Sequence, residues 1–248
     1  QLSDNALTTL DISSLTELQT INIGRNQLTA VDFSSNTKLE TLYANTTGLN
    51  SLDISSLPNL VRLQAVQNNL TSIDFSNNVS LEYILVQENN ITALDVSNNT
   101  NLIQISAYQN QIASIDVSSN INLQYLWLGG NSNDLSGSTE TNTISSLDVS
   151  NNTKLINIIV AGLNLSTIDV SQNTDLSLLN INSNNLNSLD LSANVSLEIL
   201  AIGINPITAI DVTDKPELTE FYAYGTNLTN IDLSSNSKLT LIDIADNA

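Results

Sequence analysis

The sequence predicts a β-rich solenoid: a right-handed superhelix of about eleven coils, each of 21 residues, with parallel β-ladders. Aliphatic residues recur at this period along the whole chain, and within each repeat they alternate with polar residues over two short segments. A repeat of this length cannot bury its apolar face alone, so neighbouring copies must stack. We therefore expect residues 1–248 to form a single domain. The leading leucines of the repeats are Leu18, Leu39, Leu60, Leu81, Leu102, Leu123, Leu155, Leu176, Leu197, Leu218 and Leu239.

The repeat at residues 81–101, LEYILVQENNITALDVSNNTN, shows how one coil is built. In each half, a triplet such as Ile84–Val86 alternates inward and outward with the period of a strand, and the polar run after it turns the chain. If both halves form ladders of equal spacing, the solenoid should curve only slightly, and no helix is expected in the second half. The inward residues should be Leu81, Ile84, Val86, Ile91, Leu94 and Val96.

The regular spacing is interrupted once. Equivalent second halves begin at Ile91, Ile112 and Ile144, so the last interval is 32 residues where 21 is expected. Eleven extra residues should therefore lie within 129–143, in a surface loop rich in Gly, Ser, Asn and Thr. Such a loop can carry function, or it can simply be tolerated at a corner.

Composition and charge exclude several classes of function. The net charge of −19, from 25 acidic and 6 basic residues, repels phosphate backbones, so we exclude nucleic acid as a partner. The chain has no Cys, Met or His, and we expect no cofactor, no metal site and no catalytic residue. Paired carboxylates such as Glu220 and Asp243 occur by chance in so acidic a chain. No apolar run approaches the roughly 20 residues of a membrane span.

Two segments carry a family resemblance. Residues 18–28, LQTINIGRNQL, and residues 176–186, LSLLNINSNNL, match the Leu-x-x-Leu-x-Leu-x-x-Asn-x-Leu segment of leucine-rich repeats. The full repeat, with its Leu-Asp-Val-Ser-x-Asn second half, resembles the nested bacterial subclass common in surface and secreted proteins of Bacteroidetes. The resemblance implies a secreted or cell-surface recognition module without catalysis, and we expect the chain to be a monomer. Because neither end carries a cap, we expect a domain excised from a longer chain.

Asparagines recur at both corners of the coil. An inward amide there can accept from one backbone N–H and donate to a carbonyl of the adjacent coil, so we assign these asparagines a structural role. Where Asn is replaced, the ladder should be locally broken. The replacements are Leu15, Leu57 and Lys215 in one column and Thr47, Leu163 and Thr226 in the other.

An aspartate stands in every second half, two residues before Ser or Thr. Because adjacent coils lie about 4.8 Å apart, stacked carboxylates repel one another. Either the carboxylates accept hydrogen bonds from the corner N–H groups and hydroxyls, or a cation such as Ca²⁺ bridges the coils. We favour local hydrogen bonding, since one Asp per coil supplies few ligands for a cation. This Asp column consists of Asp11, Asp32, Asp53, Asp74, Asp95, Asp116, Asp148, Asp169, Asp190, Asp211 and Asp232.

The outward positions of the first-half strands hold all six Tyr and the single Trp. We expect these positions to face solvent and to bind a protein or a cell-surface glycan, with the inserted loop as one wall, because exposed aromatic patches mark interaction sites. A cross-strand aromatic ladder can also be purely structural. The alternative function is a rigid adhesin spacer or stalk with cations along the Asp column. The candidate binding residues are Tyr43, Tyr83, Leu85, Tyr108, Tyr125, Trp127, Ile159, Tyr222 and Tyr224.

Overall fold

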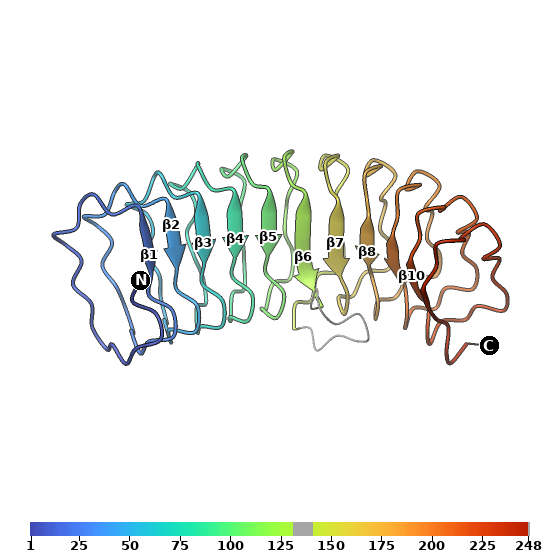
Figure 1. Cartoon of the computed structure of the whole chain (residues 1–248), viewed down its shortest axis with the longest axis horizontal. Coiled ribbons are helices and arrows are strands. Elements are labelled where there is room, and N and C mark those ends of the chain that lie inside the picture. The colour runs from blue at the N-terminus through green and yellow to red at the C-terminus, as the bar shows by residue number, and fades with distance from the viewer. Residues whose placement is uncertain (131–140, 248) are drawn as a thin grey trace.

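The computed structural model describes residues 1–130 and 141–247. In this part of the chain, eleven short strands form one parallel sheet whose order follows the sequence (Figure 1). The strands are β1 (Thr20–Asn22), β2 (Thr41–Tyr43), β3 (Arg62–Gln64), β4 (Tyr83–Leu85), β5 (Gln104–Ser106), β6 (Tyr125–Gly129), β7 (Asn157–Val160), β8 (Leu178–Asn180), β9 (Ile199–Ala201), β10 (Glu220–Tyr222) and β11 (Leu241–Asp243).

Each strand occupies the first half of a repeat. In β4 the central Ile84 is fully buried, while Tyr83 and Leu85 on either side of it point outward and are partly exposed. The register pairs Ile84 with Ile105 in β5, which is the residue one period later. The predicted parallel ladder is therefore confirmed, and it begins one residue earlier than the expected Ile84–Val86.

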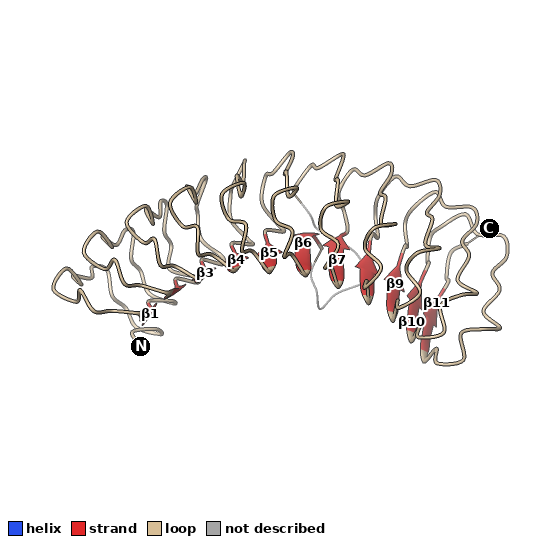
Figure 2. Cartoon of the chain, turned by 90° about the horizontal axis from the view of Figure 1, so that it is seen from above, coloured by secondary structure: helices blue, strands red, loops and turns tan. Residues whose placement is uncertain are grey.

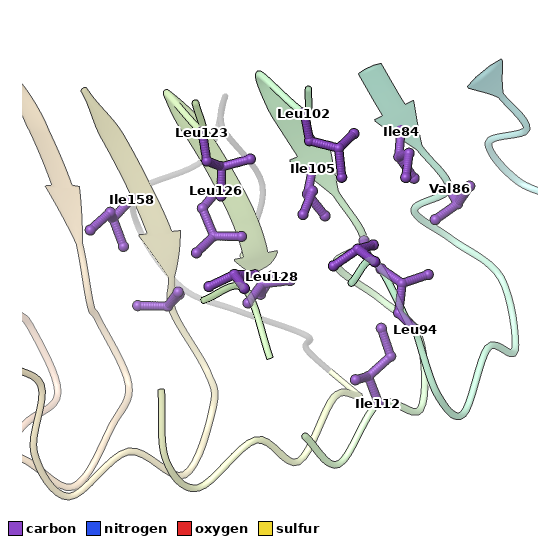
Figure 3. Packing of buried hydrophobic residues seen from close by; sticks show 14 of the residues in the cluster. Ile84, Val86, Leu94, Leu102, Ile105, Ile112, Leu123, Leu126, Leu128 and Ile158 are labelled. Carbon is purple, nitrogen blue, oxygen red and sulfur yellow. The ribbon is translucent and has the colours of Figure 1, made fainter. Parts of the chain in front are cut away.

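The inward residues stack into one continuous core along the axis of the solenoid. Figure 3 shows Ile84, Ile105, Leu126 and Ile158 in successive coils, each pointing into the same interior. All six inward residues predicted for the repeat 81–101 are buried, with at most 5% of the side chain exposed. Each coil thus covers the apolar face of the next, as the repeat length requires.

The second half of each repeat is built from turns, and it contains neither strand nor helix among the described residues. No backbone hydrogen bond joins residues 95–99, or their equivalents, to an adjacent coil in the described chain. On the strand side, backbone hydrogen bonds hold the coils about 4.8 Å apart. Because the other side lacks them, the coils open there, and the solenoid arches with its strands on the concave side (Figure 2). The condition for slight curvature, a ladder on both sides, is not met.

An asparagine follows most strands, and Asn89 after β4 shows that it is bonded as predicted. Asn89 Oδ1 accepts a hydrogen bond from the Leu70 N–H at 3.1 Å. Its Nδ2 donates to the Ala65 carbonyl at 2.8 Å and to the Val86 carbonyl at 3.0 Å. One buried amide therefore joins two coils at the corner where the ladder ends.

The asparagine of the second-half corner is bonded differently. Asn99 Nδ2 donates to the carbonyls of Asn78 at 2.8 Å and Phe75 at 3.2 Å, which links it to the preceding coil. Its Oδ1 is buried and has no hydrogen-bond partner among residues 1–130 and 141–247. The prediction that corner amides both accept and donate is therefore correct for the asparagines that follow the strands, which we call the first ladder. It is wrong for the asparagines of the second-half corners, which we call the second ladder. The other second-ladder residues with a buried, unpartnered Oδ1 are Asn36, Asn78, Asn120, Asn152, Asn173, Asn194 and Asn236.

The substituted corners lose single links, as expected. Thr47 Oγ1 donates to the carbonyl of Ala44 in its own coil at 2.6 Å, so it makes no side-chain bond to the coil before. The backbone carbonyl of Leu57 still accepts from Asn78 at 2.8 Å. Lys215 is fully buried and pairs with Asp214.

One position in each coil has a positive φ, which the sequence did not reveal. It directly precedes the first-ladder corner, and this left-handed conformation is costly for residues other than Gly and Asn. Ile204 adopts it with φ of 51°, although its branched Cβ makes this conformation unfavourable. The position is occupied by Asp4, Arg25, Thr46, Gln67, Glu88, Gln109, Gly130, Gly162, Ser183, Ile204, Gly225 and Asp246.

The two ladders should differ in their contribution to stability. We expect Asn99→Ala to lower the free energy of unfolding by about 1–3 kcal/mol, because two buried carbonyls lose their donor. Asn89→Ala should lower it by about 1 kcal/mol more, since the Leu70 N–H also loses its acceptor. Urea denaturation followed by circular dichroism measures both values. Equal losses would show that the oxygen of Asn89 contributes nothing.

Relieving the strained position should stabilise the fold. We expect Ile204→Asn to raise the free energy of unfolding by about 1 kcal/mol, because Asn tolerates the left-handed conformation better than a β-branched residue does. Ile121→Asn is the matched control, since Ile121 is similarly exposed, at 55% against 49%, and has no positive φ. A urea midpoint that rises for the Ile121 variant as well would attribute the gain to surface polarity instead.

Candidate binding surface

Each strand presents two outward side chains to the concave face, separated by one inward residue. The constant register stacks them into two columns. From β2 to β7 the first column holds Thr41, Arg62, Tyr83, Gln104, Tyr125 and Asn157. The second holds Tyr43, Gln64, Leu85, Ser106, Trp127 and Ile159.

Four of the candidate residues, Tyr83, Leu85, Tyr125 and Trp127, lie near the middle of the concave face, and we name them the central cluster. The rings of Tyr125 and Trp127 meet edge to face, with centroids 6.4 Å apart and planes at 79°. The guanidinium of Arg62 lies 3.7 Å from the centre of the Tyr83 ring, a cation–π contact. All four side chains are partly exposed.

Two candidate residues are not exposed, which corrects the expectation that all nine face solvent. Ile159 is 1% exposed and Tyr108 is 8% exposed. Ile159 stands between Trp127 and Asn180 in the second column, and its Cγ2 lies 3.7 Å from where a Cβ of Gly130 would be. These neighbours cover it.

The remaining candidates lie apart from the central cluster. Tyr43 is separated from Leu85 by Gln64, which occupies the column between them. Tyr222 and Tyr224 lie at the other end of the sheet, in and after β10. The fold therefore distributes the aromatic residues over three places along the concave face and does not gather them into one patch.

Two buried polar groups in or beside the central cluster lack hydrogen-bond partners in the described chain. Trp127 Nε1 is buried and has no hydrogen-bond partner among the described residues. Ser106, which pairs with Trp127 in the register, is fully buried and its Oγ also lacks a partner there. An unpaired buried donor costs about 1–3 kcal/mol. An acceptor brought by a binding partner would recover part of this cost.

The tyrosines near β10 are held by specific contacts. The Tyr222 hydroxyl donates to Glu220 Oε2 at 2.8 Å. Desolvation, together with the Glu220 carboxylate, raises the pKa of Tyr222 to about 12, so the phenol stays protonated at neutral pH. The Tyr224 ring lies over Gly203, where an added Cβ would approach ring carbon Cε1 to 2.8 Å. Gly203 thus makes room for the ring on the concave face.

The Asp column lies on the opposite, convex half, and hydrogen bonds stabilise its carboxylates locally. Asp95 Oδ1 accepts from the Ser97 N–H at 3.0 Å and from Ser97 Oγ at 2.7 Å. Each of the eleven carboxylates accepts from the N–H two residues further on. These bonds lower the pKa of every column Asp, and desolvation or a neighbouring Asp charge raises it less. The favoured local explanation therefore agrees with the structure.

The insertion joins the fold at the end of β6, next to Trp127. Gly130 has a positive φ, like the residue before the corner in other coils. The corner position itself is taken by Asn142, whose Oδ1 accepts a hydrogen bond from the Ile112 N–H at 2.8 Å. The extra residues are thus 131–141, inside the predicted range. Residues 131–140 lie outside the described chain, and so does the wall that we expected them to form.

A tight backbone contact precedes the insertion. The register between β6 and β7 shifts between Trp127 and Gly129. A Cβ at Gly129 would lie 2.2 Å from the carbonyl oxygen of Ala161, so only glycine fits there.

Residues 1–130 and 141–247 contain no group of three or more acidic side chains placed to hold a metal ion. They also contain no helix that is long and apolar enough to cross a membrane.

Comparison with solved structures identifies the architecture. The functional domain of InlJ from Listeria monocytogenes is 31% identical with a TM-score of 0.89, over 96% of this chain and 53% of that one. A leucine-rich-repeat protein of Leptospira interrogans is 17% identical with a TM-score of 0.69, over 99% and 83%. The Arabidopsis receptor kinase HAESA is 21% identical with a TM-score of 0.80, over 99% and 45%. The chain has the leucine-rich-repeat fold.

The comparison with InlJ also shows a difference. This chain spans about half the length of the InlJ chain, whose functional domain includes a cysteine ladder. This chain has no Cys, and its corner positions hold mainly asparagine. No protein-family model and no curated protein sequence matches it.

The Asp column should make the melting temperature depend on pH in the acidic range. Because the folded-state pKa of these carboxyls lies below the ordinary 3.8, their contribution is complete above that value and is lost as the pH falls through the lower folded-state pKa. We expect the melting temperature of the wild type to fall below pH 3.8 more steeply than that of a variant carrying Asp53→Asn, Asp74→Asn and Asp95→Asn. In that variant the amide oxygens can still accept from Ser, but they do not titrate. A wild-type melting temperature that rises relative to the variant would mean that repulsion between carboxylates dominates.

Proposed function

We propose that this chain is a non-catalytic recognition module that binds a protein partner through its concave face, with the central cluster at the centre of the interface. The observation that carries the proposal is Trp127: a partly exposed aromatic side chain in the middle of the face, packed edge-on against Tyr125, with an unpartnered buried donor. Interface energy concentrates in central aromatic residues of this kind.

The arrangement of the rings favours a protein over a cell-surface glycan. A sugar ring stacks on an open aromatic face, whereas one face of Tyr83 is covered by Arg62. The edge-to-face packing of Tyr125 and Trp127 offers no broad flat platform either. HAESA, which shares the fold, was solved in complex with a peptide hormone and a co-receptor. A protein partner is therefore the better candidate.

The proposal includes the setting of the module. We place it among secreted or cell-surface proteins of the nested 21-residue subclass known from Bacteroidetes, acting as a monomer. The alternative, a rigid adhesin spacer with cations along the Asp column, has less support, because one oxygen of each column carboxylate already accepts a local hydrogen bond.

Truncating the central tryptophan tests the proposal. We expect Trp127→Ala to weaken binding to the partner at least about tenfold, which corresponds to about 1.4 kcal/mol, because it removes the central aromatic anchor. The fold should survive, since Trp127 lies outside the core. Candidate partners come from screening the full chain against a panel of extracellular proteins and a glycan array, and surface plasmon resonance then gives the dissociation constants.

Two variants on the convex side are the controls. Asp74→Asn and Asp190→Asn should leave the dissociation constant unchanged, because both carboxylates lie on the opposite half of the coil. Normal binding by Trp127→Ala, together with lost binding in either Asp variant, would mean that the wrong face has been assigned. Selective capture of glycans would instead favour the sugar alternative.

A further inference from the structure

A hollow lies on the concave face beside the central cluster, across the first four strands. Its volume is about 460 Å³, within the range of about 300–1,000 Å³ that ligand sites occupy. Gly24 helps to form it, since a Cβ there would meet the Asn45 carbonyl oxygen at 3.0 Å. Gln64 lines the hollow and pairs with Leu85 in the register, so the hollow adjoins the central cluster.

Four primary amides from successive coils line this hollow: Asn22, Asn45, Gln64 and Gln87. The Oδ1 of Asn22 accepts from the Gly24 N–H at 3.0 Å. The Oδ1 of Asn45 accepts from the N–H of Val66 at 2.9 Å. Each of these bonds fixes the amide and turns its NH₂ group away from that N–H.

The other hydrogen-bonding groups of these amides are unused within the described chain. Asn22 Nδ2, Asn45 Nδ2 and the side chain of Gln64 form no hydrogen bond there. Gln87 Oε1 is buried without a partner in the same residues. A buried amide oxygen without a donor carries a cost of about 1–3 kcal/mol. The hollow thus contains several donors and acceptors that a ligand can satisfy.

The charge of the hollow limits the ligand. Its two charged residues, Arg25 and Asp4, form an ion pair with each other at 3.2 Å. The lining therefore presents no unpaired charge, and it contains no aromatic ring on which a sugar would stack. A primary amide has the same donor and acceptor pair as a peptide group, so the two are complementary. Uncharged main chain fits this surface best.

We propose that the hollow binds an extended, uncharged peptide segment of the protein partner, whose main-chain N–H and C=O groups pair with Asn22, Asn45, Gln64 and Gln87. Four coils at about 4.8 Å span roughly 14 Å, which corresponds to about four residues of extended chain. The segment continues onto the central cluster, where a side chain meets Trp127. This inference rests on the proposed function and names the kind of partner that the same face takes.

The test uses a displayed library of random peptides of about 10 residues, a length that covers the hollow and the central cluster. The library is selected on the full chain, and enriched peptides are synthesised with blocked ends and measured by calorimetry. We expect the enriched peptides to share a stretch of about four residues without Asp, Glu, Lys or Arg. The double variant Gln64→Ala, Gln87→Ala should raise their dissociation constants at least about tenfold. Neither side chain forms a hydrogen bond in the described chain, so the fold should be preserved.

The controls separate this inference from the proposed function. Gln172→Ala, on the convex side, should leave binding unchanged, and Trp127→Ala should weaken it. Peptides that depend on Trp127 but not on Gln64 and Gln87 would overturn the hollow as a site and leave the proposed function standing. Failure to enrich any peptide, or enrichment only of basic peptides released by salt, would also overturn the inference. If neutral oligosaccharides bind the wild type and this binding is lost in the double variant, the ligand of the hollow is a sugar and not a peptide.

Discussion

The concave face depends on hydrogen bonding that joins the coils on one side only. Backbone bonds between successive strands fix the spacing where β1 to β11 lie. On the other side, described coils are tied mainly by asparagine side chains such as Asn99, and the solenoid opens there. The resulting arch brings the outward side chains of neighbouring strands toward one another. A partner can therefore contact residues that stand 21 positions apart in sequence as immediate neighbours.

The same constraint divides the residues of each coil by role. Inward positions are apolar, and most corner positions hold an asparagine that bonds the backbone, so both kinds of position vary little. Outward strand positions are not restricted in this way. In one column, Leu85, Ser106 and Trp127 are successive neighbours. Recognition chemistry can change there from coil to coil while the scaffold is kept, as in other repeat proteins.

The sequence predicted those parts that repeat, because a period repeated eleven times identifies inward residues without ambiguity. It could not distinguish the two halves, since Ile84–Val86 and Leu94–Val96 alternate alike and only backbone pairing makes one of them a strand side. The burial of Ile159 depends on a local approach by Gly130. The sequence did not predict the hollow, because Asn and Gln are common throughout this chain. Nothing in the sequence indicates that Gly24 leaves space beside Asn45.

The distribution of charge explains how so acidic a chain can present a specific face. Eleven carboxylates project from the convex half, where each accepts a hydrogen bond from a neighbouring backbone N–H. On the concave face both arginines are already engaged, Arg25 with Asp4 and Arg62 with the Tyr83 ring. Net charge keeps chains soluble and repels other anions without choosing a partner. In the interface that we propose, selectivity would depend on the amides and aromatic rings, whose hydrogen bonds and packing are short-ranged and require complementary shape.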